Sequence, residues 1–162
     1  MAARRTVPTT MATTKARRAF HLQKPGTPSW RSGLEGKVGA ELEARGVKVY
    51  YEVVVVSYEK PAQKSRYTAD FFLPNGIIIE TKGWFVTADR KKHKLIKEQH
   101  PNLDIRFVFS NPNAKIGKLS KTTYAKWCDD NGFKWAKASI PDEWLDEPTD
   151  RLRLKAAMEF MK

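Results

Sequence analysis

The stretch YTADFFLPNGIIIETKG, residues 67–83, decides how this chain folds. Two apolar runs flank Pro74-Asn75-Gly76, a pattern typical of two antiparallel strands joined by a tight turn. A three-residue loop over Pro-Asn-Gly has the order of a type I turn closed by a glycine in the left-handed region. This loop would pair Leu73 with Ile77 and set the register of every residue behind them.

The length of the loop decides whether two carboxylates meet. With a two-residue Asn-Gly loop, Asp70 would lie opposite Thr81 and on the wrong face for Glu80. With the three-residue loop, Asp70 lies directly opposite Glu80, and Lys82 shares their face because residues two apart in a strand point the same way. The turn chemistry favours the longer loop, so the sequence predicts one face that carries all three charged groups.

Facing carboxylates repel each other by up to about 1 kcal/mol, so their pairing needs a reason. A divalent cation gives one, because Mg²⁺ takes oxygen ligands and often one or two carboxylates. Lys82 would then place a positive charge beside an attacking water or a phosphate oxygen. This pattern, in which an Asp is followed after a spacer by Glu, any residue and Lys, resembles the hydrolytic core of the PD-(D/E)xK nucleases. The pattern is loose, because a solvated sheet face with a Glu–Lys pair gives the same letters.

Outside the hairpin, the order of expected elements predicts an α/β domain with a mixed sheet and helices on its faces. Ser32 and Glu35 match a capping box at the start of a helix that Gly46 ends. Further helices are expected over 87–100, 122–131 and 151–161. One long strand or a pair of strands is expected over 47–58, another strand over 105–110, and a polar connection over 61–66.

Charge and composition point to a polyanion partner. The 162 residues carry a formal net charge of +12 and a single cysteine, Cys128, so no internal disulfide can form. Residues 1–34 hold seven basic residues and no acidic one. We expect residues 1–29 to form a basic arm that neutralises phosphates, with Arg17 and Arg18 among the contacts. An organelle-targeting segment or a merely solvated tail would have the same composition.

The sequence also argues against several classes of protein. No apolar run approaches the roughly 20 residues of a membrane span, and we expect neither a signal peptide nor a membrane partner. No pattern suggests a small-molecule cofactor. His93 and His100 lack the spacing of a zinc set, and His93 is expected at the surface. Trp127, Trp135 and Trp144 are expected in the core or at a subunit contact.

Five segments, in order along the chain, make residues 31–148 resemble endonuclease I of the T-seven-like phages. They are RSGLE (31–35), YTADF (67–71), LPNGIIIETKG (73–83), DRKKHKLIKEQHPNLDIRFVFS (89–110) and IPDEWLDEP (140–148). The resemblance implies a restriction-endonuclease-like fold and a metal-dependent endonuclease that resolves four-way, or Holliday, junctions and other branched DNA. Ala69 stands where the family commonly has proline.

The resemblance also assigns the site. It places the catalytic set on Glu35, Asp70, Glu80 and Lys82. Asp70, Glu80 and the backbone carbonyl of Thr81 would hold one Mg²⁺, and Glu35 would help to hold a second about 4 Å away. Mn²⁺ would substitute for Mg²⁺.

By the same resemblance the molecule is an intertwined, strand-swapped homodimer. A nuclease domain over residues 30–148 would include a bridge strand at about 47–61, and residues 149–162 would form a C-terminal extension, expected to be helical. The protein would act in the cytoplasm of a bacterial host and be encoded by a phage. DNA contacts are expected from the basic helix and from the residue before the capping box, namely from Arg31, Arg90, Lys91, Lys92 and Lys94.

Two alternatives stay open at this stage. One is another PD-(D/E)xK nuclease that acts on linear or mismatched duplex DNA. The other is a non-catalytic basic protein that binds nucleic acid and whose acidic hairpin is incidental. A binding protein of that kind would tolerate Asp70→Ala with full affinity and would show no cleavage.

Overall fold

The structure is a computed structural model that describes residues 30–60 and 62–161. The predicted arm over residues 1–29, with Arg17 and Arg18, lies outside the described residues. A five-stranded sheet has the order β1-β4-β5-β6-β7. β5 is antiparallel to β4 and parallel to β6, so the predicted mixed sheet is confirmed. The strands are β1 (Tyr50–Tyr51), β4 (Phe71–Phe72), β5 (Ile77–Lys82), β6 (Asp104–Phe109) and β7 (Trp135–Lys137).

The register of the β4–β5 hairpin is the one that the three-residue loop predicts. Phe71 pairs with Ile79, and Phe72 with Ile78. The amide of Leu73 donates to the carbonyl of Ile77 at 2.9 Å, which closes the loop. Gly76 has a φ of 92°, a left-handed conformation that glycine adopts without steric cost.

The prediction of a polar connection over residues 61–66 is wrong. Gln63–Thr68 forms β3, which pairs with β2 (Val55–Lys60) in a separate antiparallel sheet of two strands. Most of β3 is exposed, and Tyr67 is its one buried residue. A two-stranded sheet that is exposed to solvent on most of its surface does not need alternating apolar and polar side chains. The sequence of β3 therefore gives little indication of a strand. The segment 47–58, expected as one long strand or a pair of strands, forms two strands, β1 and β2, which are separated near Glu52, whose φ is 51°.

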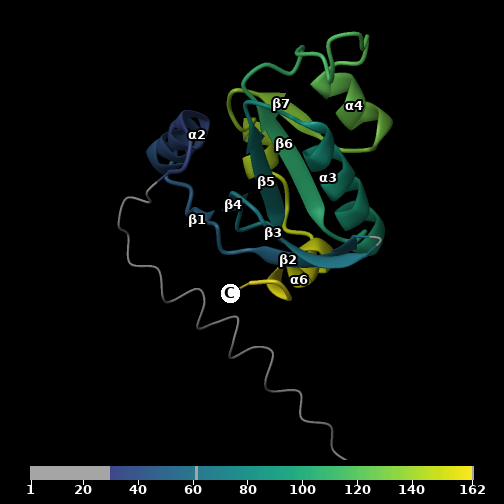
Figure 1. Ribbon diagram of the computed structural model, residues 1–162. Coiled ribbons are helices and arrows are strands. Elements are labelled where there is room, and N and C mark those ends of the chain that lie inside the picture. Colours follow the sequence, from purple (N-terminus) through teal and green to yellow (C-terminus); the bar gives the residue numbers. More distant parts are fainter. Residues whose placement is uncertain (1–29, 61, 162) are drawn as a thin grey trace, which may run out of the picture.

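Helices cover both faces of the five-stranded sheet (Figure 1). Val38 and Leu42 of α2 pack with Phe71 and Ile79 on one face. The opposite face carries Phe72 and Ile78, against which α3, α4 and α6 pack. The helices are α2 (Gly33–Ala44), α3 (Thr87–Gln99), α4 (Tyr124–Asp130), α5 (Asp142–Leu145) and α6 (Arg151–Met158). No helix in the described part of the chain is long and apolar enough to cross a membrane.

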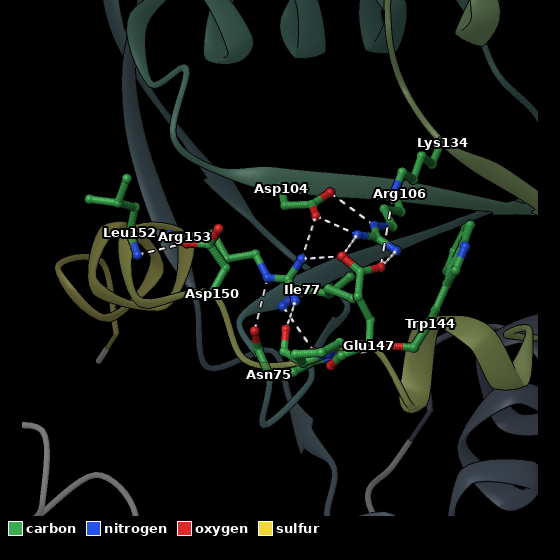
Figure 2. Close-up of polar contacts among 11 residues, drawn as sticks. Asn75, Ile77, Asp104, Arg106, Lys134, Trp144, Glu147, Asp150, Leu152 and Arg153 are labelled. Carbon is green, nitrogen blue, oxygen red and sulfur yellow. Dashed lines mark hydrogen bonds and ion pairs between the residues drawn. The ribbon is translucent and has the colours of Figure 1, made fainter.

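A network of two arginines and two carboxylates joins the sheet to the C-terminal segment (Figure 2). Arg106 on β6 is completely buried, and its guanidinium forms ion pairs with Asp104 at 2.6 Å and with Glu147 at 2.7 Å. Arg153 on α6 bridges the same two carboxylates, at 3.1 and 2.6 Å. The charges of these four groups sum to zero, so the completely buried guanidinium of Arg106 is compensated, and Lys134 adds a longer contact to Glu147 at 3.8 Å.

The same network clamps the hairpin turn. The Nε of Arg153 donates to the carbonyl of Asn75 at 2.9 Å. The side-chain amide of Asn75 in turn donates to the carbonyls of Trp144 and Glu147, at 2.8 and 3.0 Å. Gly76 lies directly against α6, because a Cβ at this position would stand 2.9 Å from the backbone nitrogen of Leu154. The turn that sets the register is therefore fixed from outside the hairpin.

Gly76→Ala should therefore destabilise the fold. The left-handed conformation costs a residue with a Cβ roughly 1–2 kcal/mol, and contact with the backbone of α6 adds to this loss. We expect a lower urea midpoint of unfolding. Gly117→Ala is the matched control, because a Cβ there meets nothing within 4 Å. Equal midpoints for the two variants would contradict the clamp.

Candidate active site

The register of the β4–β5 hairpin, which pairs Phe71 with Ile79, places Asp70 just before β4 and opposite Glu80. The backbone amide and the hydroxyl of Thr81 both donate to Oδ2 of Asp70, at 2.7 and 2.9 Å. Within the described residues, Oδ1 of Asp70 makes no hydrogen bond and is available to a ligand. In a strand the N–H and C=O of one residue point the same way, so the carbonyl of Thr81 also faces the side of Asp70.

Glu80 is held by a set of polar and aromatic neighbours. Its side chain is almost completely buried, with the residue 2% exposed. The Nζ of Lys82 lies 2.8 Å from Oε1, as expected for two residues that share a face. The hydroxyl of Tyr67 donates to Oε2 at 2.6 Å. These two contacts hold both oxygens of the Glu80 carboxylate in place.

The expectation that His93 is a surface residue is wrong. His93 is 0% exposed and lies edge-on to the rings of Tyr67 and Phe107. Its Nε2 is 3.6 Å from Oε1 of Glu80, too long for a hydrogen bond. Sequence reasoning missed both His93 and Tyr67 as neighbours of the acid pair. The signal was the spacing of three that His93 shares with Arg90 and Ile96, the buried residues of α3.

The two carboxyl groups titrate far apart. Burial and the nearby charge of Glu80 raise the pKa of Asp70 to about 7, although the donors of Thr81 oppose this shift. Burial alone would raise the pKa of Glu80, but the Lys82 ammonium, in contact with the carboxylate, and the nearby charge of Lys92 hold it below its usual value. Burial lowers the pKa of His93. At neutral pH the site thus holds one firmly ionised carboxylate beside one whose ionisation is unfavourable.

This arrangement suits a divalent cation. A bound cation would remove the repulsion that raises the pKa of Asp70, and two carboxylates with one carbonyl are oxygen ligands that Mg²⁺ accepts. In the described part of the chain, no group of three or more His, Cys, Asp or Glu residues could hold a metal ion. The hairpin of one chain thus offers two carboxylates, and water or substrate would complete the coordination.

Glu35 does not join the acid pair within one chain. Ser32 caps α2 by accepting from the amide of Glu35 at 3.2 Å, as the capping box predicts. The carboxylate of Glu35 accepts from the amide of Arg31 at 3.1 Å and from the hydroxyl of Tyr51. Since α2 packs on the Phe71 face of the sheet, Glu35 lies on the opposite face from Glu80.

The predicted DNA-binding residues divide into two groups. Arg90 is buried, and its guanidinium donates to the carbonyls of Phe85 and Ile116, so it is not available for phosphate contact. Lys91 and Lys94 are exposed on α3. Lys92 is half-buried, binds Asp89 at 3.2 Å and lies over the ring of Tyr67, close to the acid pair. Arg31 is exposed and forms an ion pair with Glu52 at 2.9 Å.

A mixed sheet that carries two facing carboxylates and a lysine defines a candidate hydrolase of phosphodiesters. Comparison with known proteins makes the assignment specific. The family described as Phage endonuclease I matches residues 11–160. The chain is 51% identical over 132 residues to Endonuclease I of Escherichia phage T7, covering 78% of this chain and 89% of that protein. It is 50% identical over 120 residues to Endodeoxyribonuclease 1 of Enterobacteria phage T3, covering 74% and 79%. The chain belongs to the phage endonuclease I family and is a nuclease.

Asp70→Asn should stabilise the protein in metal-free buffer. The folded-state pKa of Asp70, about 7, lies above the ordinary value of 3.8, so ionisation costs folding free energy as the pH rises between these values. Asparagine removes this cost and still accepts from Thr81. We expect a gain of about 1–4 kcal/mol at pH 8, vanishing near pH 4, in urea unfolding with a chelator.

The exposed residue Asp146 offers the control, because Asp146→Asn removes a carboxylate charge from the surface. A loss of stability on Asp70→Asn at pH 8 would show that Asp70 and Glu80 do not repel each other in the folded protein.

Proposed function

We propose that this protein is a structure-selective DNA endonuclease that resolves four-way and other branched junctions by metal-dependent hydrolysis of phosphodiesters. The observation that carries the proposal is the facing pair of Asp70 and Glu80 with Lys82 beside it. The pair lies in a chain whose relatives are named Endonuclease I and Endodeoxyribonuclease 1. A nuclease of this kind would act in the cytoplasm of a bacterial host.

The residues of the hairpin have separable roles in this proposal. Asp70, Glu80 and the carbonyl of Thr81 would hold Mg²⁺, and Mn²⁺, which also accepts oxygen ligands, would substitute. Bound Mg²⁺ would supply a water of lowered pKa and stabilise charge on the oxygens of the phosphodiester. The ammonium of Lys82, 2.8 Å from Glu80, would orient the nucleophile and balance negative charge in the transition state.

A homodimer would account for Glu35. This residue lies on the other face of the sheet from Glu80, although the family resemblance places it in the catalytic set. An intertwined dimer that exchanges the bridge at residues 47–61 would bring Glu35 of one protomer to the acid pair of the other. There it would help to hold a second Mg²⁺. Two such sites related by a two-fold axis match the approximate symmetry of a four-way junction.

The charge of the chain supports a DNA substrate. A net charge of +12 favours binding to phosphates, and Lys91 and Lys94 lie exposed on the helix that packs behind Glu80. Contacts of this kind recognise the backbone and shape of DNA rather than its sequence. Arg17, Arg18 and Arg31 would add phosphate contacts.

A cleavage assay tests the proposal. An end-labelled four-way junction and the matching linear duplex are each incubated with the protein, once with Mg²⁺ and once with a chelator. We expect paired nicks near the branch point that need the metal. Lys82→Ala and Glu35→Ala should lose activity, Lys82→Ala by about a hundredfold or more. Lys155→Ala, an exposed lysine on α6, is the control and should cut as the wild type does.

The alternatives predict other results in the same assay. Tight binding of the junction without cutting, in any divalent metal, would identify a non-catalytic binding protein. Equal cutting of the linear duplex would identify a nuclease without selectivity for branched DNA.

A further inference from the structure

A groove of about 450 Å³ opens beside the catalytic strand. Trp84 and Val86, on the loop that follows β5, line it on one side, and Lys115 and Lys118, on the loop between β6 and α4, line it on the other. We call this the Trp84 groove. Trp84 is 78% exposed, which is unusual for an indole in a chain that buries most of its aromatic rings.

The two walls of the Trp84 groove are held by buried residues beneath them. Phe85 is buried among the rings of Phe107, Phe109, Tyr124 and Trp127. The guanidinium of Arg90 donates to the carbonyl of Phe85 in one wall and, at 3.3 Å, to that of Ile116 in the other. Arg90, which is buried, therefore joins the two loops. Trp84 is presented to solvent on an anchored support.

The Trp84 groove lies at the edge of the sheet that carries the acid pair. The strands β5 and β6 are parallel, so their carboxyl ends share one edge, and the amide of Ser110 donates to the carbonyl of Lys82 at 3.2 Å. Trp84 follows Lys82 by two residues, with Gly83 between them. A DNA strand bound at Lys82 would thus have its next nucleotides beside the indole.

The far wall is strongly basic. Lys115 and Lys118 are exposed, and neither has an ion pair with any residue that the structure describes. The sequence holds no acidic residue between Asp104 and Asp129. Uncompensated lysines around an exposed aromatic ring form a surface suited to nucleic acid, in which cations contact phosphates and the ring stacks on a base.

We propose that the Trp84 groove holds the DNA next to the scissile phosphate, with the Trp84 indole stacked on the base exposed at the branch point. Lys115 and Lys118 contact the flanking phosphates. In a linear duplex each internal base is covered by its neighbours, whereas stacking is interrupted where helical arms meet. Trp84 therefore contributes selectivity for branched DNA, and the lysines contribute affinity for any DNA. This inference rests on the proposed function.

Binding in chelator, which prevents cleavage, separates the two contributions. Trp84→Ala should weaken binding of a four-way junction about five- to a hundredfold, the range for removing one base–aromatic stack. Binding of the matching linear duplex should change less than about twofold. Trp84→Phe keeps an aromatic face and should restore most of the junction affinity. Leu152→Ala, which truncates another exposed apolar side chain, is the control.

The lysines should behave differently from the indole. Lys115→Ala combined with Lys118→Ala should weaken the binding of both DNAs to a similar extent. The slope of log affinity against log salt should fall by about 0.9 for each phosphate that the double variant no longer neutralises. An unchanged slope would show that these lysines do not bind DNA phosphates in the groove.

Photocrosslinking tests directly whether the base next to the branch point contacts Trp84. A junction with 5-iododeoxyuridine next to the branch point should crosslink to the peptide that contains Trp84. The inference is overturned if Trp84→Ala leaves junction binding unchanged, if it weakens duplex binding equally, or if crosslinks form at other peptides while the wild type still cuts the junction. A wild type that neither binds nor cuts branched DNA would overturn the proposed function together with the inference.

Discussion

The register of one hairpin is the constraint on which the rest of the structure depends. A loop of three residues brings Asp70 opposite Glu80, and a loop shorter by one residue would send the two to different faces. Asn75 and Gly76 in this loop are held by Arg153, which belongs to the ionic network of Arg106, Asp104 and Glu147. The C-terminal helix thus stabilises the geometry of a site to which it contributes no side chain.

This constraint keeps an unfavourable arrangement in place. Two carboxyl groups are brought together in a buried position, and the pKa of Asp70 rises to about 7 as a result. Tyr67 and Lys82 orient Glu80, so the pair cannot separate by simple rotation of a side chain. Free energy gained in the core and in the ionic network is available to offset this repulsion. The proposed cation site therefore comes at a cost to the stability of the metal-free protein.

The sequence predicted the parts of the fold that local chemistry determines. The Pro-Asn-Gly turn, the cap at Ser32 and the basic helix expected over 87–100 were all predicted correctly. The sequence did not reveal β3, because this strand is mostly polar and exposed to solvent. It also did not reveal the burial of Arg90 and His93, which depends on the elements that α3 packs against. The position of Glu35 relative to the acid pair could not be predicted either, because a helical pattern does not indicate which face of a sheet the helix will cover.

The central claim is that the hairpin register creates a cation site. Thermal unfolding with and without Mg²⁺ tests this claim most directly. A ligand that binds only the folded state raises the midpoint as its concentration exceeds its dissociation constant. The account predicts that Mg²⁺ raises the midpoint of the wild type and leaves those of Asp70→Asn and Glu80→Gln unchanged. A wild-type midpoint that does not respond to Mg²⁺, or an equal rise in all three proteins, would contradict it.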